Sequence, residues 1–69
     1  MNAILAIVLQ VLPLAIQGSL GALQVIEEAR RTFATMAAEG REEPTDAEVA
    51  AVRAIRERSY GDFFADDEA

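Results

Sequence analysis

The first 26 residues of the chain contain no charged side chain. Thirteen of the residues in 3–26 are Leu, Ile or Val. As one continuous helix this segment would be about 36 Å long, enough to cross a hydrocarbon core of about 30 Å. The rest of the chain is too polar to cover such a helix on all sides. We therefore expect this apolar segment to be buried in a membrane or in an oligomer.

Composition excludes several classes of function. The chain has 69 residues and a net charge of −6, which argues against nucleic acid as a partner. It contains no Cys and no His, so thiolate and imidazole groups are missing as nucleophiles, general bases and metal ligands. No catalytic or phosphate-binding motif is present. The sequence thus predicts a protein that is not an enzyme and that has no catalytic, cofactor-binding or metal-binding residues.

The length of the chain also limits its architecture. A solitary core in so short a chain barely offsets conformational entropy, and oligomerisation or a membrane is the usual remedy. The helical pattern continues past the apolar segment into charged residues without interruption. We therefore predict a long helix over 1–38, with a candidate transmembrane span over 3–26.

Pro13 interrupts the predicted helix. It has no amide donor and crowds the carbonyl group of Leu9, which predicts a kink in a continuous helix. Alternatively, Pro13 lies in the first turn of the main helix, and residues 1–11 form a separate short segment.

Three glutamines recur at seven-residue spacing: Gln10, Gln17 and Gln24. Seven residues correspond to two helical turns, so on one helix these side chains form a single stripe. The stripe is either the solvent side of an amphipathic helix or a set of amide layers turned inward between copies of the helix. Chance spacing is the third interpretation. An unpaired amide in an apolar setting costs about 1–3 kcal/mol, which favours paired layers and a candidate oligomer interface.

A second face of the predicted helix carries the small residues Ala15, Gly18 and Ala22. Such residues let a neighbouring backbone approach closely, so they are further candidates for the oligomer interface. Alternatively, Gly18 and Gly21 flex or break the helix, since each glycine makes helix formation about 1 kcal/mol less favourable than alanine would. The third face is broad and apolar, and it consists of Leu5, Leu9, Leu12, Ile16, Leu20 and Leu23.

Gly40 is a natural helix stop, and residues 39–45 read as a short polar turn. Thr45 and Glu48 then match a capping box, in which each side chain bonds to the backbone amide of the other. This motif is the most specific local signal in the chain. It predicts that a second helix begins at Asp46.

The second helix is predicted over 46–58, with Val49, Val52 and Ile55 on one face. It either folds back on residues 27–38 as a helical hairpin or stands at an angle to the first helix in an L shape. The fold class is therefore all-α, a long kinked helix and a short one assembled as an oligomer. We expect the three arginines of this helix to form a solvated surface: Arg53, Arg56 and Arg58.

The C-terminal tail, residues 59–69, combines aromatic and acidic side chains. Two interpretations stay open. Its aromatic residues either fold back onto the two helices or anchor the tail in a groove of a partner protein. The candidate docking residues are Tyr60, Phe63 and Phe64.

The layout of the chain resembles the small helical proteins encoded among phage structural and lysis genes. The features that carry this resemblance are the apolar first helix, the segment from Gly40 to Ala54 and the short acidic tail. The resemblance implies either a minor virion component that assembles with tail or ejection proteins, or a holin-like membrane oligomer. Holin-like proteins commonly carry a basic end segment, whereas this chain ends in an acidic one.

Together these observations predict a non-enzymatic homo-oligomer located in a virion or similar macromolecular assembly. It would associate through residues 3–30 and dock through its tail into a larger protein assembly. The alternative is a single-span membrane oligomer, in which Arg30 and Arg31 would hold the C-terminal part in the cytoplasm.

Overall fold

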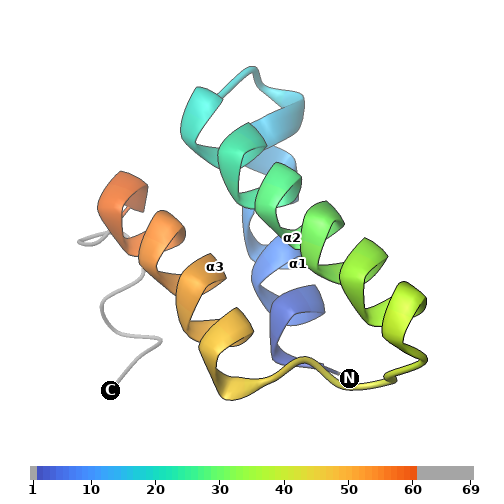
Figure 1. Ribbon diagram of the computed structural model, residues 1–69. Coiled ribbons are helices and arrows are strands. Elements are labelled where there is room, and N and C mark those ends of the chain that lie inside the picture. Colours follow the sequence, from blue (N-terminus) through green and yellow to red (C-terminus); the bar gives the residue numbers. More distant parts are fainter. Residues whose placement is uncertain (1, 61–69) are drawn as a thin grey trace.

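The computed structural model of the chain describes residues 2–60, and these residues form a three-helix bundle (Figure 1). The helices are α1 (Ala3–Ile16), α2 (Leu20–Glu39) and α3 (Asp46–Tyr60). Each helix packs against both of the others. The prediction of an all-α fold is confirmed.

The long kinked helix predicted over 1–38 is replaced by two helices. Pro13 lies inside α1, and the chain reverses direction a few residues later, through residues 17–19. α2 then runs back along α1 (Figure 1). The interpretation in which glycine breaks the helix therefore holds at Gly18.

Local hydrogen bonds explain why the break falls at Gly18. Its φ angle is +94°, a left-handed conformation that favours glycine. The Gly18 amide donates to the Ala15 carbonyl at 3.0 Å, and the Ser19 amide donates to the Leu14 carbonyl at 3.0 Å. These two bonds form a Schellman motif, which satisfies the last carbonyl groups of α1. Ser19 then caps α2, because its Oγ accepts a hydrogen bond from the Ala22 amide at 3.3 Å.

The segment 3–26, the candidate transmembrane span, is thus divided between two antiparallel helices. α1 has 14 residues and a length of about 21 Å, less than a hydrocarbon core of about 30 Å. Among the described residues, none of the three helices is both long and apolar enough to cross a membrane.

The second turn agrees with the sequence analysis. Gly40 has a φ angle of +68°, and the Arg41 amide donates to the Met36 carbonyl at 2.9 Å, which closes the end of α2. The capping box is present as predicted. The Thr45 amide donates to the Glu48 carboxylate at 2.8 Å, and the Glu48 amide donates to the Thr45 hydroxyl at 3.1 Å.

The core lies between the three helices. α3 packs against α2, as in the predicted hairpin, and its Val52 is fully buried. The accessible surface of 4523 Å² is close to the value of about 4200 Å² for a compact 7.4 kDa monomer. One side of the apolar segment is thus buried within the chain itself. We had expected an oligomer or a membrane to bury this segment. The core residues are Ile4, Ile7, Val11, Ala22, Val25, Ala29 and Val52.

Candidate functional site

The outer face of α1 carries a row of exposed apolar side chains, which we call the leucine seam: Leu5, Leu9, Leu12 and Ile16. Their exposed fractions are 39%, 50%, 40% and 79%. Spacings of four, three and four residues place all four on one side of the helix, opposite the buried side chains of Ile4, Ile7 and Val11. The same spacing is typical of the contact positions of a coiled coil.

No charge lies on or beside the seam within α1. The residues that flank it on the helix are Ala6, Pro13, Val8 and Ala15. Leu20, the first residue of α2, is a further exposed apolar residue at 75%. A continuous apolar row of this kind differs from the single exposed hydrophobic residues of ordinary surfaces and is typical of an association surface.

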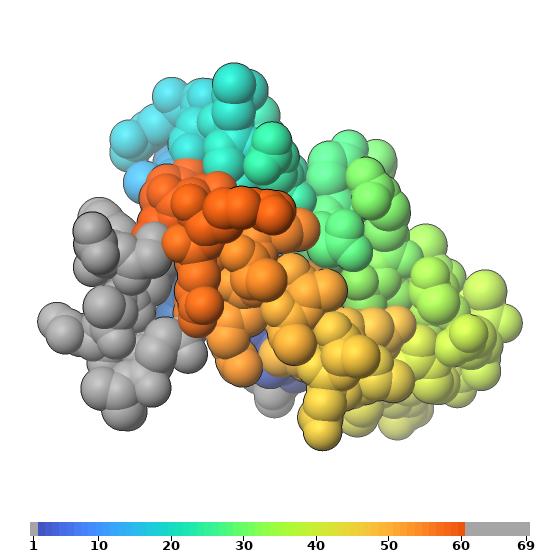
Figure 2. Space-filling view, turned by 60° about the vertical axis from the view of Figure 1, so that its left-hand side comes forward, coloured from blue at the N-terminus to red at the C-terminus, as the bar shows by residue number. Residues whose placement is uncertain are grey.

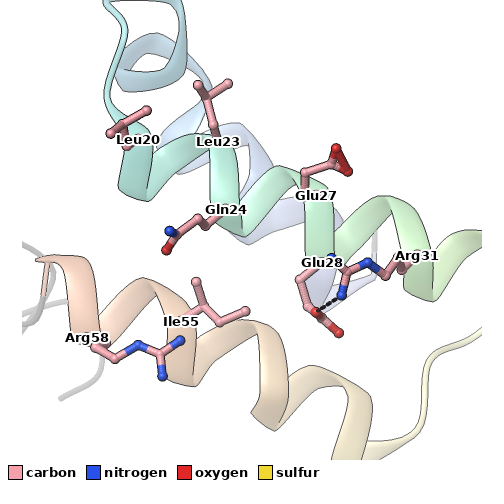
Figure 3. Close-up of a pocket in the computed structure, with 8 residues that line it drawn as sticks. All are labelled: Leu20, Leu23, Gln24, Glu27, Glu28, Arg31, Ile55 and Arg58. Carbon is pink, nitrogen blue, oxygen red and sulfur yellow. Dashed lines mark hydrogen bonds and ion pairs between the residues drawn. The ribbon is translucent and has the colours of Figure 1, made fainter.

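A groove of about 520 Å³ lies between α2 and α3 (Figure 3). Its apolar lining comes from Leu20, Leu23 and Ile55. Polar side chains complete the lining, and two of them form an exposed ion pair, in which Arg31 donates to Glu28 at 3.3 Å. Such pairs contribute little to stability. The remaining lining residues are Gln24, Glu27 and Arg58.

The structure separates the three glutamines that the sequence placed on one stripe. Gln10 faces α3, where its side-chain oxygen accepts a hydrogen bond from Nη1 of Arg56 at 2.8 Å. Gln17 is the exposed C-cap residue that follows α1. Gln24 lies on α2 and lines the groove. Because the helix breaks at Gly18, the seven-residue spacing does not bring these side chains to a common face.

Arg56 is the residue that sequence reasoning missed. We expected a solvated side chain, but only 3% of Arg56 is exposed. The sequence contained a signal, since positions 49, 52 and 56 have the spacing of one helix face. In the structure this face is turned inward, and Val52 on it is fully buried. Arg56 therefore belongs to the face that α3 turns toward α1, where its guanidinium group meets Gln10.

The three small residues predicted for an oligomer interface have different surroundings in the structure. Ala22 is fully buried, Ala15 is half-buried, and Gly18 forms the turn. The close approach that small residues allow is found instead at Gly21, where a Cβ atom would lie 2.8 Å from the Cβ of Ser59. Small side chains thus bring α2 and α3 of one chain together.

Tyr60, predicted to dock to a partner, is half-buried at the end of α3. Its hydroxyl group is hydrogen-bonded to the hydroxyl of Ser19, so α3 ends against the turn between α1 and α2. Figure 2 shows this contact between the C-terminal end of α3 and the turn. Tyr60 therefore has a structural role within the bundle. The other two predicted docking residues, Phe63 and Phe64, lie outside the described residues.

A network of charged side chains lies at the turn between α2 and α3. Arg41 donates two hydrogen bonds to the Glu48 carboxylate, at 3.0 and 2.9 Å, and a third to Glu39 at 2.7 Å. The bonds from Arg41, followed by that from the Thr45 amide, lower the pKa of Glu48 to about 2. This network holds the turn and has a structural role.

The described residues contain no group of three or more side chains that could hold a metal ion. Comparison with protein families, with curated proteins and with solved structures finds no match for this chain. Within residues 2–60, the leucine seam and the groove between α2 and α3 are candidate surfaces for binding a partner.

Proposed function

We propose that this chain is a non-enzymatic helical protein that self-assembles through the leucine seam. One observation carries the proposal: four large apolar side chains are between 39% and 79% exposed on a helix without charged residues. Burying a fully exposed side chain of this size is worth about 1.5–3 kcal/mol, and burying the fraction that each seam residue still exposes is worth a corresponding part of that value. A partner that covers the seam would therefore remove the exposed parts of four apolar side chains from water, which favours association.

The surface of the whole chain sets the scale for such an interface. A standard interface removes about 800 Å² per partner from solvent, less than a fifth of the 4523 Å² surface of this chain. Leu20 and Leu23 on α2, 75% and 44% exposed, are further apolar side chains that line the groove between α2 and α3.

A second copy of the chain is the partner that we propose, because two acidic chains can meet through α1 without bringing charges together. Each copy carries a net charge of −6, so two copies repel each other over most of their surfaces. α1 is the helix without any charge, and contact through it keeps the acidic residues of α2 and α3 away from the interface. A partner with a basic surface would find no acidic group on α1 to bind.

From the resemblance to phage-encoded helical proteins, we propose that this assembly is a minor structural component of a virion. In that role the seam would join copies of the chain, and the C-terminal tail would bind the larger assembly. Support for this context comes from the layout of the sequence alone.

The test is sedimentation velocity of the full chain in buffer without detergent. We expect a discrete oligomer, and we expect Leu9→Gln to raise the dissociation constant at least about tenfold, equivalent to about 1.4 kcal/mol. The matched control is Ala50→Gln, at an exposed position on α3, which should leave the dissociation constant unchanged. A folded monomer for the unmodified chain would overturn the proposal.

A further inference from the structure

We propose that two copies pair through the leucine seam in antiparallel orientation, about a two-fold axis that passes between Leu9 and Leu12. This inference rests on the self-association proposed above and adds the geometry of the contact. The spacing of the seam allows this orientation, and the distribution of charge along the bundle favours it.

The spacing of the seam is the same from either end. From Leu5 to Ile16 the intervals are four, three and four residues. When the second copy is reversed, Leu5 meets Ile16 of the second copy, and Leu9 meets Leu12 of the second copy. The surface is thus complementary to itself, as a two-fold interface requires.

The residues that flank the seam do not select an orientation. In coiled coils, charged side chains at the flanking positions select between parallel and antiparallel pairing. The flanking residues here are apolar or small: Ala6, Pro13, Val8 and Ala15. The orientation must therefore depend on charges elsewhere in the bundle.

Charge is distributed unevenly between the two ends of the bundle. Residues 39–48 comprise the turn between α2 and α3 and the residues that adjoin it on both helices, and we call this segment the acidic loop. It contains five acidic residues and one arginine. This loop lies at the end of the bundle where α1 begins (Figure 1). At the opposite end, the last two turns of α3 contain Arg53 and Arg58 against a single acidic residue, Glu57, while the third arginine of these turns, Arg56, is buried against α1.

Parallel pairing would place two acidic loops at the same end of the dimer, where they repel each other. Antiparallel pairing separates the loops and places each one at the level of the arginines of the other copy. The helix dipoles of the two α1 helices add a small effect in the same direction. The four acidic residues after Gly61 lie outside the described residues, and the repulsion between the loops does not depend on them.

Single-cysteine variants test the orientation, because the native chain contains no cysteine. Leu5→Cys and Ile16→Cys, of which one carries a mass label, are oxidised separately and as an equimolar mixture. A disulfide requires Cβ atoms about 3.5–4.5 Å apart. Positions 5 and 16 are separated by about 16 Å along one helix, so only antiparallel pairing brings them together between copies. Ala50→Cys, exposed on α3, is the control for random collision.

We expect the mixture to form the mixed disulfide at least about tenfold faster than either variant forms its own dimer or than the control does. Leu9→Cys mixed with Leu12→Cys should give a second mixed disulfide. Faster self-linking of Leu5→Cys and of Ile16→Cys would show parallel pairing and overturn this inference, while the self-association itself would stand. A monomer in sedimentation of the unmodified chain would overturn both. Circular dichroism of each variant should show the helical content of the native chain.

Discussion

Arg56 in α3 donates a hydrogen bond of 2.8 Å to the side-chain oxygen of Gln10 in α1, although the two residues are 46 positions apart in the chain. Only 3% of Arg56 is exposed, so this bond satisfies part of a buried charged group. It also fixes how α3 lies along α1. The pair thus connects the first helix with the last one.

Gln10→Ala removes the acceptor from this pair. Because a hydrogen bond to a charged group contributes about 1.5–3 kcal/mol, we expect the free energy of unfolding to fall by about that amount. Urea denaturation measures the change. Gln24→Ala, at an exposed position on α2, is the matched control and should change stability by less than about 0.5 kcal/mol. Equal effects of both substitutions on stability would contradict the role assigned to the pair.

Glu48 predicts a pH dependence of stability. Its pKa is lowered from 4.5 to about 2, chiefly by hydrogen bonds from Arg41 and next by the bond from the Thr45 amide. A lowered pKa in the folded state means that this stabilisation is present above about pH 4.5 and is lost as the pH falls toward 2. Glu48→Gln should therefore lower the melting temperature at pH 7 and reduce its fall between pH 5 and pH 2. Thermal unfolding followed by circular dichroism measures both.

The control for this prediction is Glu42→Gln, which removes an exposed carboxylate from the same turn. We expect this variant to keep the pH dependence of the native chain. If Glu48→Gln retained that dependence as well, another group would be responsible for it.

Gly18→Ala tests the break between α1 and α2. A Cβ atom at this position would meet no heavy atom within 4 Å, so the effect arises from the φ angle of +94° alone. A left-handed conformation costs an L-residue about 1–2 kcal/mol, and we expect that loss in the free energy of unfolding. Gly18→Asn should lose less, because Asn tolerates this conformation better. An unchanged stability in Gly18→Ala would show that the turn is not held in this conformation.

Gly21→Ala tests the close approach of α2 and α3. Alanine would gain about 1 kcal/mol in helix propensity. However, its Cβ would lie 2.8 Å from both the Cβ and the Oγ of Ser59, and overpacking costs about 1–3 kcal/mol. We expect a net loss of stability in urea denaturation. Combining Gly21→Ala with Ser59→Gly should give a smaller loss than the sum of the two single effects, whereas strict additivity would contradict the contact.

The sequence predicted the features that local interactions encode. Gly40 ends α2, and Thr45 and Glu48 cap α3, because their hydrogen bonds join residues at most five positions apart. The apolar face that contains the leucine seam was also predicted, since its helical spacing persists in α1. Helix breaking at Gly18 was one of two open interpretations. A glycine can lie within a helix or end it, because its helix propensity is only about 1 kcal/mol less favourable than that of alanine.

What the sequence by itself determined is therefore the helical class, the caps and the apolar faces, which depend on neighbours in the chain. Only the tertiary structure decided the rest. It showed that the apolar segment folds back on itself, that Gln10 binds Arg56, and that Ala22 packs in the core of its own chain. These contacts join residues from different helices, and burial against those helices decides which faces remain free. The leucine seam remains exposed because α2 and α3 cover only one side of α1.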